Sequence, residues 1–378
     1  MAGPLNGIRV VDLTTVISGP YATQILGDMG AEVIKVEAPG GDIMRAAGPS
    51  RSPDMGAAFL NSNRNKKSVV LNLKDREHRS ELEALVRTAD VFIHNMRMTA
   101  AERLGLTYPE LQALSPNLVY CSIVGYGQSG PYRDRPAYDD VVQAGAGWAD
   151  LERRVRGEPA YAPTIVADKT TALFAVSAIN AALFHRARTG QGQSIEVPMY
   201  ELLASFLLVE HLAGQTFRPA LGPPGYSRLL SPHRHPYRTK DGYISVMPYT
   251  GAHWRAFFNA AGRREWAEDT RLQSNADRIA IIDLLYERLT ICLAELTTSE
   301  WMALLLPLDV PCSPVNSIED LLQDEHLHAV GLFKTVAHPT EGSILSVQTP
   351  LRFSATPCTA DAFAPSLSDK ARATSESA

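Results

Sequence analysis

The N-terminal half of the chain alternates short apolar runs with helix-like stretches, and this alternation limits the possible folds more than any other feature. Apolar runs that predict buried strands cover residues 8–13, 31–37, 68–73, 90–95, 117–125 and 193–199. Helices are predicted at residues 18–30, 81–88, 140–150, 170–188 and 200–213. Because strands that alternate with helices pair in parallel, the pattern predicts an α/β fold with a parallel sheet covered by helices on both faces.

The rest of the chain predicts a second, smaller domain. A length of 378 residues is more than one compact core usually holds. A Pro/Gly-rich linker at residues 218–226 marks the boundary. Beyond it we expect a strand at 242–247, two or three helices between 252 and 306, and strand-like sequence again at 343–353. The predicted divisions are a large domain at 1–222, a small α+β domain at 223–330 and a C-terminal segment at 331–378, whose last twenty or so residues are frayed.

Composition excludes several classes of protein. The net charge of −5 argues against a general nucleic-acid binder. No apolar run reaches the roughly 18 residues of a membrane span, and the N-terminus lacks the pattern of a signal peptide. None of the four cysteines forms a C-x-x-C pair, and the histidines lack metal-site spacing. We therefore expect free thiols, a cytoplasmic location, no membrane partner and no metal.

A dinucleotide cofactor is also disfavoured. The turn after the first predicted strand, residues 14–20, has no G-x-G-x-x-G, whose glycines let the backbone approach a pyrophosphate. A literal match at residues 125–130 continues into Pro131 and not into a helix, so its context is wrong. The sequence also lacks the G-x-S-x-G and H-E-x-x-H motifs. No redox cofactor is expected.

Basic residues cluster in the predicted sheet domain. They are Lys35, Arg45, Arg64, Lys66, Lys67, Lys74, Arg97 and Arg103. Several follow predicted strands, at the carboxyl edge where α/β sheets bind ligands. Any one of them can be a solvated loop charge, but as a set they favour a phosphorylated, nucleotide-like ligand.

Asp168 is a lone carboxylate between an apolar stretch and the long helix predicted to follow it. At a helix start it lies against the positive end of the helix dipole, which favours its ionised form. Asp is a preferred N-cap, and residues 167–170 fit a plain capped helix start. An ionised, partly buried carboxylate can also attack an activated acyl group. The two roles are compatible.

Taken together, the motifs resemble the class III coenzyme A transferases, which include formyl-CoA transferase and are related to α-methylacyl-CoA racemase. The resemblance runs in order through residues 7–14, 18–22, 26–37, 41–42, 61–68, 89–95, 125–132, 135–139 and 186–197. It is dense over about the first 210 residues and loose after them.

The resemblance implies a set of site residues. Asp168 matches the nucleophile, and Tyr138 matches a position that lines the active site near the thioester. The positions expected to contact coenzyme A are Val16, Ile17, Ser18, Lys35, Ala38, Leu71, Asn72, Lys74, Asn95, Met96, Arg97 and Arg103. It further implies a Rossmann-like large domain, a C-terminal segment that returns to it, and an interlocked homodimer.

The sequence departs from the family pattern at several positions. Ile17 stands where the formyl-CoA enzyme has Gln, so we expect a different substrate. The racemases place a His near the position of Tyr138, and its absence disfavours racemisation, which would need Tyr138 or His94 opposite Asp168. The glycine-rich loop of the small domain is reduced to residues 248–252. The alternatives to a transferase are a racemase or epimerase and a silent acyl-CoA-binding protein.

The predicted activity is transfer of coenzyme A from an acyl-CoA to a carboxylic acid through aspartyl anhydride and aspartyl thioester intermediates. Arg228, His233, Arg234 and His235 begin the predicted small domain. They are either surface charges of a linker or a clamp for a second carboxylate, which would suit a dicarboxylic acid.

Overall fold

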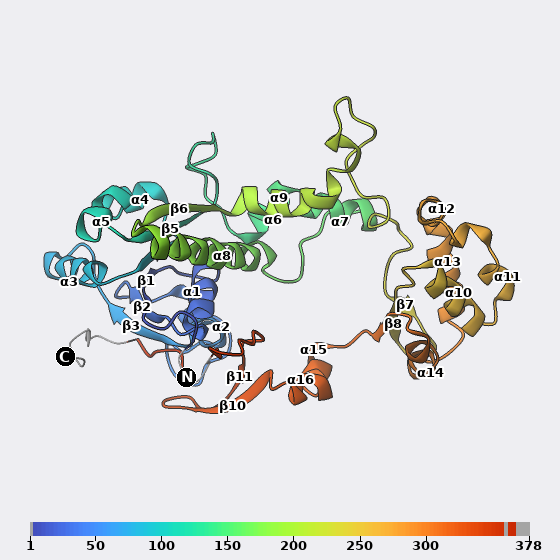
Figure 1. The fold of residues 1–378 in the computed structure, drawn as a ribbon. Coiled ribbons are helices and arrows are strands. Elements are labelled where there is room, and N and C mark those ends of the chain that lie inside the picture. Colours follow the sequence, from blue (N-terminus) through green and yellow to red (C-terminus); the bar gives the residue numbers. More distant parts are fainter. Residues whose placement is uncertain (1–2, 359–361, 368–378) are drawn as a thin grey trace. The chain divides into compact units, whose positions relative to one another are not determined.

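A computed structural model describes residues 3–358 and 362–367 (Figure 1). The chain forms two compact units. The first, the sheet unit, contains the chain up to residue 148, residues 161–206 and the chain from residue 326. The second, the helical unit, contains residues 149–160 and 207–325. The division at 206/207 lies before the predicted linker, and the domain limits 1–222, 223–330 and 331–378 stay a prediction.

The sheet unit is built on six parallel strands in the order β3-β2-β1-β4-β5-β6. Their bounds are β1 (Arg9–Leu13), β2 (Glu32–Glu37), β3 (Lys66–Val70), β4 (Val91–His94), β5 (Val119–Val124) and β6 (Gln193–Pro198). Each falls within or next to a predicted apolar run. The parallel pairing confirms the predicted α/β fold.

Helices cover both faces of this sheet. Val11, Phe92 and Tyr120 pack in one apolar core with α3 (Arg76–Arg87), α4 (Met98–Arg103) and α5 (Tyr108–Leu114). Side chains alternate along a strand, so Asp12 and Lys35 face the other side. There α1 (Ser18–Asp28) packs along α8 (Val166–Thr189). The remaining elements of the unit are η1 (Ile43–Ala46), α2 (Ala57–Ser62), α6 (Asp139–Ala146), and most of α9 (Met199–His211).

Predicted helix ends needed correction. The helix predicted at 140–150 is two helices, α6 and α7 (Trp148–Arg156), because Gly147 adopts a φ of 102° at the C-cap of α6. The N-caps of α1 and α8 are Ile17 and Ile165, and neither makes a side-chain cap. The predicted caps Ser18 and Asp168 therefore lie inside the first turns, which leaves their side chains free for other contacts.

The helical unit contains a three-stranded antiparallel sheet and more helices than predicted. The sheet joins β7 (Tyr237–Arg238), β8 (Tyr243–Val246) and β9 (Cys312–Pro314). Five helices lie where two or three were predicted: α10 (Gly251–Ala260), α11 (Arg264–Ala267), α12 (Asn275–Ala280), α13 (Ile282–Leu293) and α14 (Thr298–Leu305). Buried aromatic residues, including Trp254, Phe257, Tyr286 and Trp301, form its core.

The chain returns to the sheet unit through α16 (Glu325–Ala329) and an antiparallel hairpin of β10 (Phe333–His338) and β11 (Gly342–Val347). A short helix, α15 (Ile318–Leu321), precedes it. The Arg64 guanidinium donates to the carbonyl of Val347 at 2.7 Å, and the Arg45 guanidinium donates to that of Pro365 at 3.2 Å. The predicted frayed tail begins at residues close to 359 and lies largely outside the described residues.

Candidate active site

The candidate active site lies where α1 and α8 begin. Asp168 stands in the first turn of α8 and is 8 % exposed. The hydroxyl of Ser18, the first residue of α1, lies near this carboxylate and lowers its pKa. The backbone N–H of Asp168 donates to Oδ1 of Asp139 at 2.9 Å. Three elements therefore meet at this carboxylate.

The pKa of Asp168 is raised to about 6, first by burial and then by the charge of Asp139, while the Ser18 hydroxyl opposes the rise. A carboxylate with this pKa is still mostly ionised at neutral pH. It is also more basic than an ordinary aspartate, and a more basic carboxylate is a stronger nucleophile. The site thus favours covalent attack on an acyl group.

Asp139 is a site residue that sequence reasoning missed. It is the first residue of α6, and its Oδ2 accepts from the Gln143 amide at 2.5 Å. The Oε1 of Gln143 accepts from the backbone N–H of Ala162 at 2.8 Å, which ties α6 to the segment before α8. The available signal is the family-like motif at residues 135–139, which ends in Asp139.

Tyr138 and His94 differ in their suitability as acid/base groups. Tyr138 precedes Asp139 at the N-cap of α6, and its side chain is 67 % exposed. His94 is fully buried, its Nε2 lies 2.6 Å from the Tyr120 hydroxyl, and burial lowers its pKa to about 4. A neutral, enclosed imidazole cannot exchange a substrate proton, so His94 does not supply the second group that a racemase needs.

The carboxyl ends of β2, β3 and β4 place the predicted coenzyme A contacts at one edge of the sheet, because these strands and β1 are neighbours. Ala38 follows β2, and Leu71, Asn72 and Lys74 follow β3. Asn95, Met96 and Arg97 follow β4. Arg103 ends α4. Lys74, Arg97 and Arg103 are exposed, and within the described ranges no carboxylate lies within 4 Å of their charged groups.

Five of the eight basic residues already form ion pairs with carboxylates. The ammonium of Lys35 is fully buried against Asp42 at 3.0 Å, and that of Lys66 against Asp12 at 3.2 Å. Arg45 pairs with Glu37, Arg64 with Asp28 and Lys67 with Glu32. Lys35, Arg45 and Lys66 are buried, whereas Lys67 is exposed, and sequence alone reveals neither their burial nor their partners.

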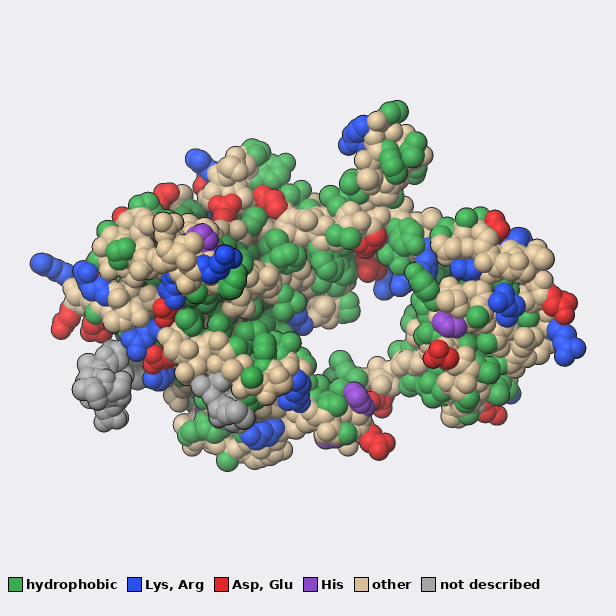
Figure 2. All heavy atoms as spheres, viewed as in Figure 1, with side chains coloured by type: hydrophobic (Ala, Val, Ile, Leu, Met, Phe, Trp, Pro, Cys, Tyr) green, Lys and Arg blue, Asp and Glu red, His purple; other side chains and the backbone are tan. Residues whose placement is uncertain are grey.

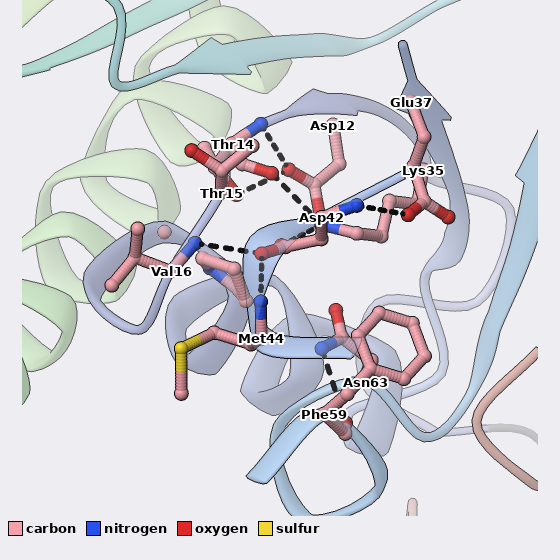
Figure 3. A network of polar contacts seen from close by, with 12 residues as sticks. Asp12, Thr14, Thr15, Val16, Lys35, Glu37, Asp42, Met44, Phe59 and Asn63 are labelled. Carbon is pink, nitrogen blue, oxygen red and sulfur yellow. Dashed lines mark hydrogen bonds and ion pairs between the residues drawn. The ribbon is translucent and has the colours of Figure 1, made fainter. Parts of the chain in front are cut away.

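The loop between β1 and α1 is held by side chains from other elements (Figure 3). The Asn95 side chain accepts from the Thr15 N–H at 2.9 Å and donates to the Thr15 carbonyl at 2.8 Å. The Val16 N–H donates to Asp42 at 3.2 Å. Ile17 and Ser18 follow directly. Asn95 and Asp42 thus anchor the loop that carries these predicted coenzyme A contacts. Asn95 is itself one of the predicted contacts.

In the helical unit, Arg228 lies among neutral groups. Its Nε donates to the Tyr286 hydroxyl at 2.9 Å, its Nη2 lies 3.0 Å from the Met247 sulfur, and its guanidinium stands 5.0 Å from the centre of the Tyr249 ring. Among the residues that the structure describes, no carboxylate lies within ion-pair distance of it. His233 is half-buried, whereas Arg234 and His235 are exposed. Arg228 is thus the strongest candidate of the four for binding an anion.

The described residues show no metal site and no clear membrane span. No group of three His, Cys, Asp or Glu side chains is placed to hold a metal ion in residues 3–358 and 362–367. Over the same ranges no single helix is long and apolar enough to cross a membrane. Only α13 and the helical stretch that starts with α14, taken together and sharply bent between them, have the length and composition of a span.

The candidate site is a buried carboxylate where two helices of a parallel α/β sheet begin. The comparisons with known proteins identify the class of protein to which this fold and site belong. The chain belongs to CoA-transferase family III, whose pattern matches residues 5–370, and it is a CoA-transferase that uses CoA thioesters.

Relatives and solved structures extend the match over nearly the whole chain. A succinate–glutarate CoA-transferase of Agrobacterium fabrum is 34 % identical and covers 97 % of this chain and 93 % of its own. The succinyl-CoA–L-malate CoA-transferase alpha subunit of Chloroflexus aurantiacus is 35 % identical over 94 % of this chain and 84 % of its own. The crystal structure of a CAIB/BAIF family protein from Brucella suis superposes with a TM-score of 0.81 at 31 % identity, covering 98 % of this chain and 97 % of that one.

Proposed function

We propose that this enzyme moves coenzyme A from an acyl-CoA to a dicarboxylic acid, with Asp168 as the covalent carrier. The observation that carries the proposal is the buried Asp168 carboxylate, which lies near Ser18 and Asp139 and is mostly ionised at neutral pH. The relatives named for succinate, glutarate and malate support a dicarboxylate acceptor.

Four substitutions at carbonyl carbon account for the transfer. The Asp168 carboxylate attacks the donor thioester, the C–S bond breaks, and a mixed anhydride and the CoA thiolate result. The thiolate attacks the aspartyl carbonyl and releases the donor acid as a carboxylate, leaving an aspartyl thioester. The acceptor carboxylate attacks this thioester, and the thiolate finally attacks the acceptor carbonyl, which frees Asp168.

The environment of Asp168 suits this sequence. No step gains or loses a proton, so no general acid or base is required. Burial keeps water from the anhydride, which would otherwise hydrolyse. The Ser18 hydroxyl near the carboxylate and the exposed Tyr138, which precedes Asp139, are proposed to contact the reacting groups. Backbone amides of residues 248–252 are proposed to stabilise the oxyanions.

Coenzyme A is proposed to bind along the carboxyl edge of β1 to β4. The exposed cations Lys74, Arg97 and Arg103 are available for its phosphates. The contacts at Ala38, Leu71, Asn72 and Met96 would be made along the same edge. Because the Lys35 ammonium is already paired with Asp42, only the backbone of Lys35 is proposed as a contact.

Arg228 is proposed to bind the second carboxylate of the acceptor, with His233 and Arg234 near it in sequence. A guanidinium surrounded by a hydroxyl, a thioether and an aromatic face keeps its charge free for an incoming anion. Arg228→Met should raise the KM for dicarboxylates at least about tenfold and leave monocarboxylates unaffected. Arg238→Met, an exposed arginine on β7, is the control. Equal effects on both acid classes would contradict this role.

Assembly and location are proposed as follows. Exposed apolar side chains on α8, among them Leu173, Phe174 and Phe184, support a covering partner (Figure 2). We propose an interlocked homodimer. The Chloroflexus relative, in contrast, is named as the alpha subunit of an enzyme that also has a beta subunit. All four cysteines are unpaired, which supports a reducing cytoplasm.

The direct test is an exchange assay with succinyl-CoA and a panel of mono- and dicarboxylic acids, analysed by mass spectrometry. New thioesters of dicarboxylic acids are the expected products. Exchange of the α-proton with solvent and no new thioester would indicate a racemase. Binding with neither reaction would indicate a silent acyl-CoA-binding protein.

A further inference from the structure

Val16 has a backbone conformation that its side chain disfavours. Its φ is 71°, in the left-handed region, where a β-branched residue is strained. Such strain persists only where the surroundings impose it. Val16 lies in the loop between β1 and α1, two residues before Ser18.

Contacts from three other elements impose this conformation. The Thr14 N–H donates to Asp12 at 2.8 Å, and the Thr14 carbonyl accepts from the Lys35 ammonium at 2.8 Å. Both polar groups of the Thr15 peptide pair with the Asn95 side chain. The Val16 N–H donates to Asp42. The loop backbone is thus fixed residue by residue.

Asp42 connects these contacts. Its Oδ1 accepts from the backbone N–H groups of Val16 and Met44, at 3.2 and 3.0 Å. Its Oδ2 accepts from the Lys35 ammonium at 3.0 Å, and the side chains of both are fully buried. One carboxylate therefore holds Val16 directly and Thr14 through Lys35 (Figure 3). In the part of the chain that the structure describes, Asp42 makes no hydrogen bond or ion pair with Asp168.

The position of the loop determines where α1 begins. Ser18 is the first residue of that helix, it is 3 % exposed, and its hydroxyl lies near the Asp168 carboxylate, whose pKa it lowers. A change in the conformation of Val16 would rotate the chain just before Ser18 and move this hydroxyl. Two side chains from other helices affect the pKa of Asp168: the charge of Asp139 on α6 raises it, and the uncharged Ser18 hydroxyl on α1 lowers it.

We propose that Asp42 is a positioning residue: by holding Val16 in its strained conformation, it keeps the Ser18 hydroxyl near the Asp168 carboxylate. This inference rests on the proposed function, in which Asp168 is the covalent carrier. It adds that the buried Asp42 carboxylate, which does not contact the reacting atoms, sets the position of Ser18 relative to Asp168.

The test compares Asp42→Ala, which removes the acceptor for Val16, with Asp42→Asn, which keeps an acceptor oxygen there. In Asp42→Ala, kcat should fall about tenfold or more, because the hydroxyl beside the nucleophile is misplaced. Displacement of the Ser18 hydroxyl should also move the acidic limb of the kcat profile to higher pH by about half a unit or more. In Asp42→Asn, kcat and the position of the acidic limb should both return most of the way to the wild-type values.

Asp28→Asn is the matched control. Asp28 is also a buried carboxylate in an ion pair, with Arg64, but it lies at the other end of α1. Its loss should lower thermal stability and leave the acidic limb unchanged. Should Asp42→Ala not fold, Asn95→Ala removes two loop contacts at a half-buried position without breaking an ion pair, and the same shift is expected.

A second measurement separates this inference from the proposed function. The titration of the Asp168 carboxyl is followed by infrared difference spectroscopy on the ligand-free protein and assigned by its absence in Asp168→Asn. A higher pKa in Asp42→Ala or Asn95→Ala supports the positioning role even if the protein transfers no coenzyme A. A folded variant with the wild-type carboxyl pKa would overturn it.

Discussion

At the scale of single residues, the pKa of Asp168 makes activity pH-dependent. With that pKa raised to about 6 by burial and by Asp139, transfer should lose activity as the pH falls through 6, because the protonated carboxyl is no nucleophile. At about pH 5 kcat should lie roughly tenfold below its plateau. A profile flat from about pH 5 to 8 would be incompatible with Asp168 as the carrier.

Asp139→Asn tests the electrostatic part of this effect. The amide keeps an acceptor for the Asp168 N–H but removes the like charge that raises the pKa of Asp168. The acidic limb should therefore move to lower pH. Asp140→Asn, on the same helix but exposed, should leave the limb in place. An equal shift in both variants would mean that the overall charge, and not Asp139 in particular, sets the pKa of Asp168.

Asp168→Asn should also change stability. In the unfolded chain the carboxyl ionises near 3.8, whereas in the folded protein its pKa is about 6. The wild type thus loses stability as the pH rises through this window, by about 3 kcal/mol at most, and the variant does not. The stability gain of Asp168→Asn should grow from about pH 4 to pH 7 in chemical denaturation. A gain that does not depend on pH would contradict the raised pKa.

Sequence reasoning reached some of these residues and not others. Asp168 stood out because it is a lone carboxylate at the start of an apolar helix. The identification of the helix cap was wrong, because propensity favours Asp as a cap over Ile165, which the fold uses. Asp139 and Asp42 were missed as site residues because their roles depend on partners more than twenty residues away in the sequence.

At the scale of secondary-structure elements, the exposed cations at the end of β4 and on α4 test the binding edge. Replacing Arg97 and Arg103 by Gln should weaken coenzyme A binding by about tenfold or more and lower turnover at saturation less, since phosphate contacts bind ground and transition state alike. Arg76→Gln with Arg87→Gln, exposed on α3, is the control pair. Unchanged affinity by calorimetry would place the ligand elsewhere.

Strands were predicted better than helices. Buried parallel strands are continuous apolar runs, so each strand of the six-stranded sheet could be located to within a few residues. Several of the five helices α10 to α14 are joined by segments without Gly or Pro, so the sequence predicted two or three longer helices in their place. The β10 strand was missed because its residues 333–338 mix apolar and polar side chains and are largely exposed.

At the scale of the whole molecule, the proposed interlocked dimer makes a prediction about assembly. If segments near residues 215–225 and 330–340 wrap the partner, subunits cannot separate without unfolding. The interface should far exceed the standard class of about 1,600 Å². The thermal midpoint should then rise with protein concentration. A folded monomer by light scattering at nanomolar to micromolar concentration would refute the arrangement.

The division of the molecule was only partly predictable. The Pro/Gly-rich linker at 218–226 indicated where a second unit begins, but the compact units divide at 206/207 and residues 149–160 join the second unit. The excursion begins inside a stretch that was predicted as one helix, residues 140–150, so no boundary was expected there. Substrate identity likewise depends on groups brought together in three dimensions, which a single sequence does not place.

The measurement that tests the central claim most directly is mass spectrometry of the protein quenched during turnover with succinyl-CoA and hydroxylamine. Hydroxylamine cleaves an activated aspartyl carbonyl and leaves a hydroxamate on that side chain. We predict a hydroxamate on Asp168 that requires the donor thioester and is absent in Asp168→Asn. Coenzyme A transfer without any modification of Asp168, or transfer at the wild-type rate in Asp168→Asn, would contradict the account.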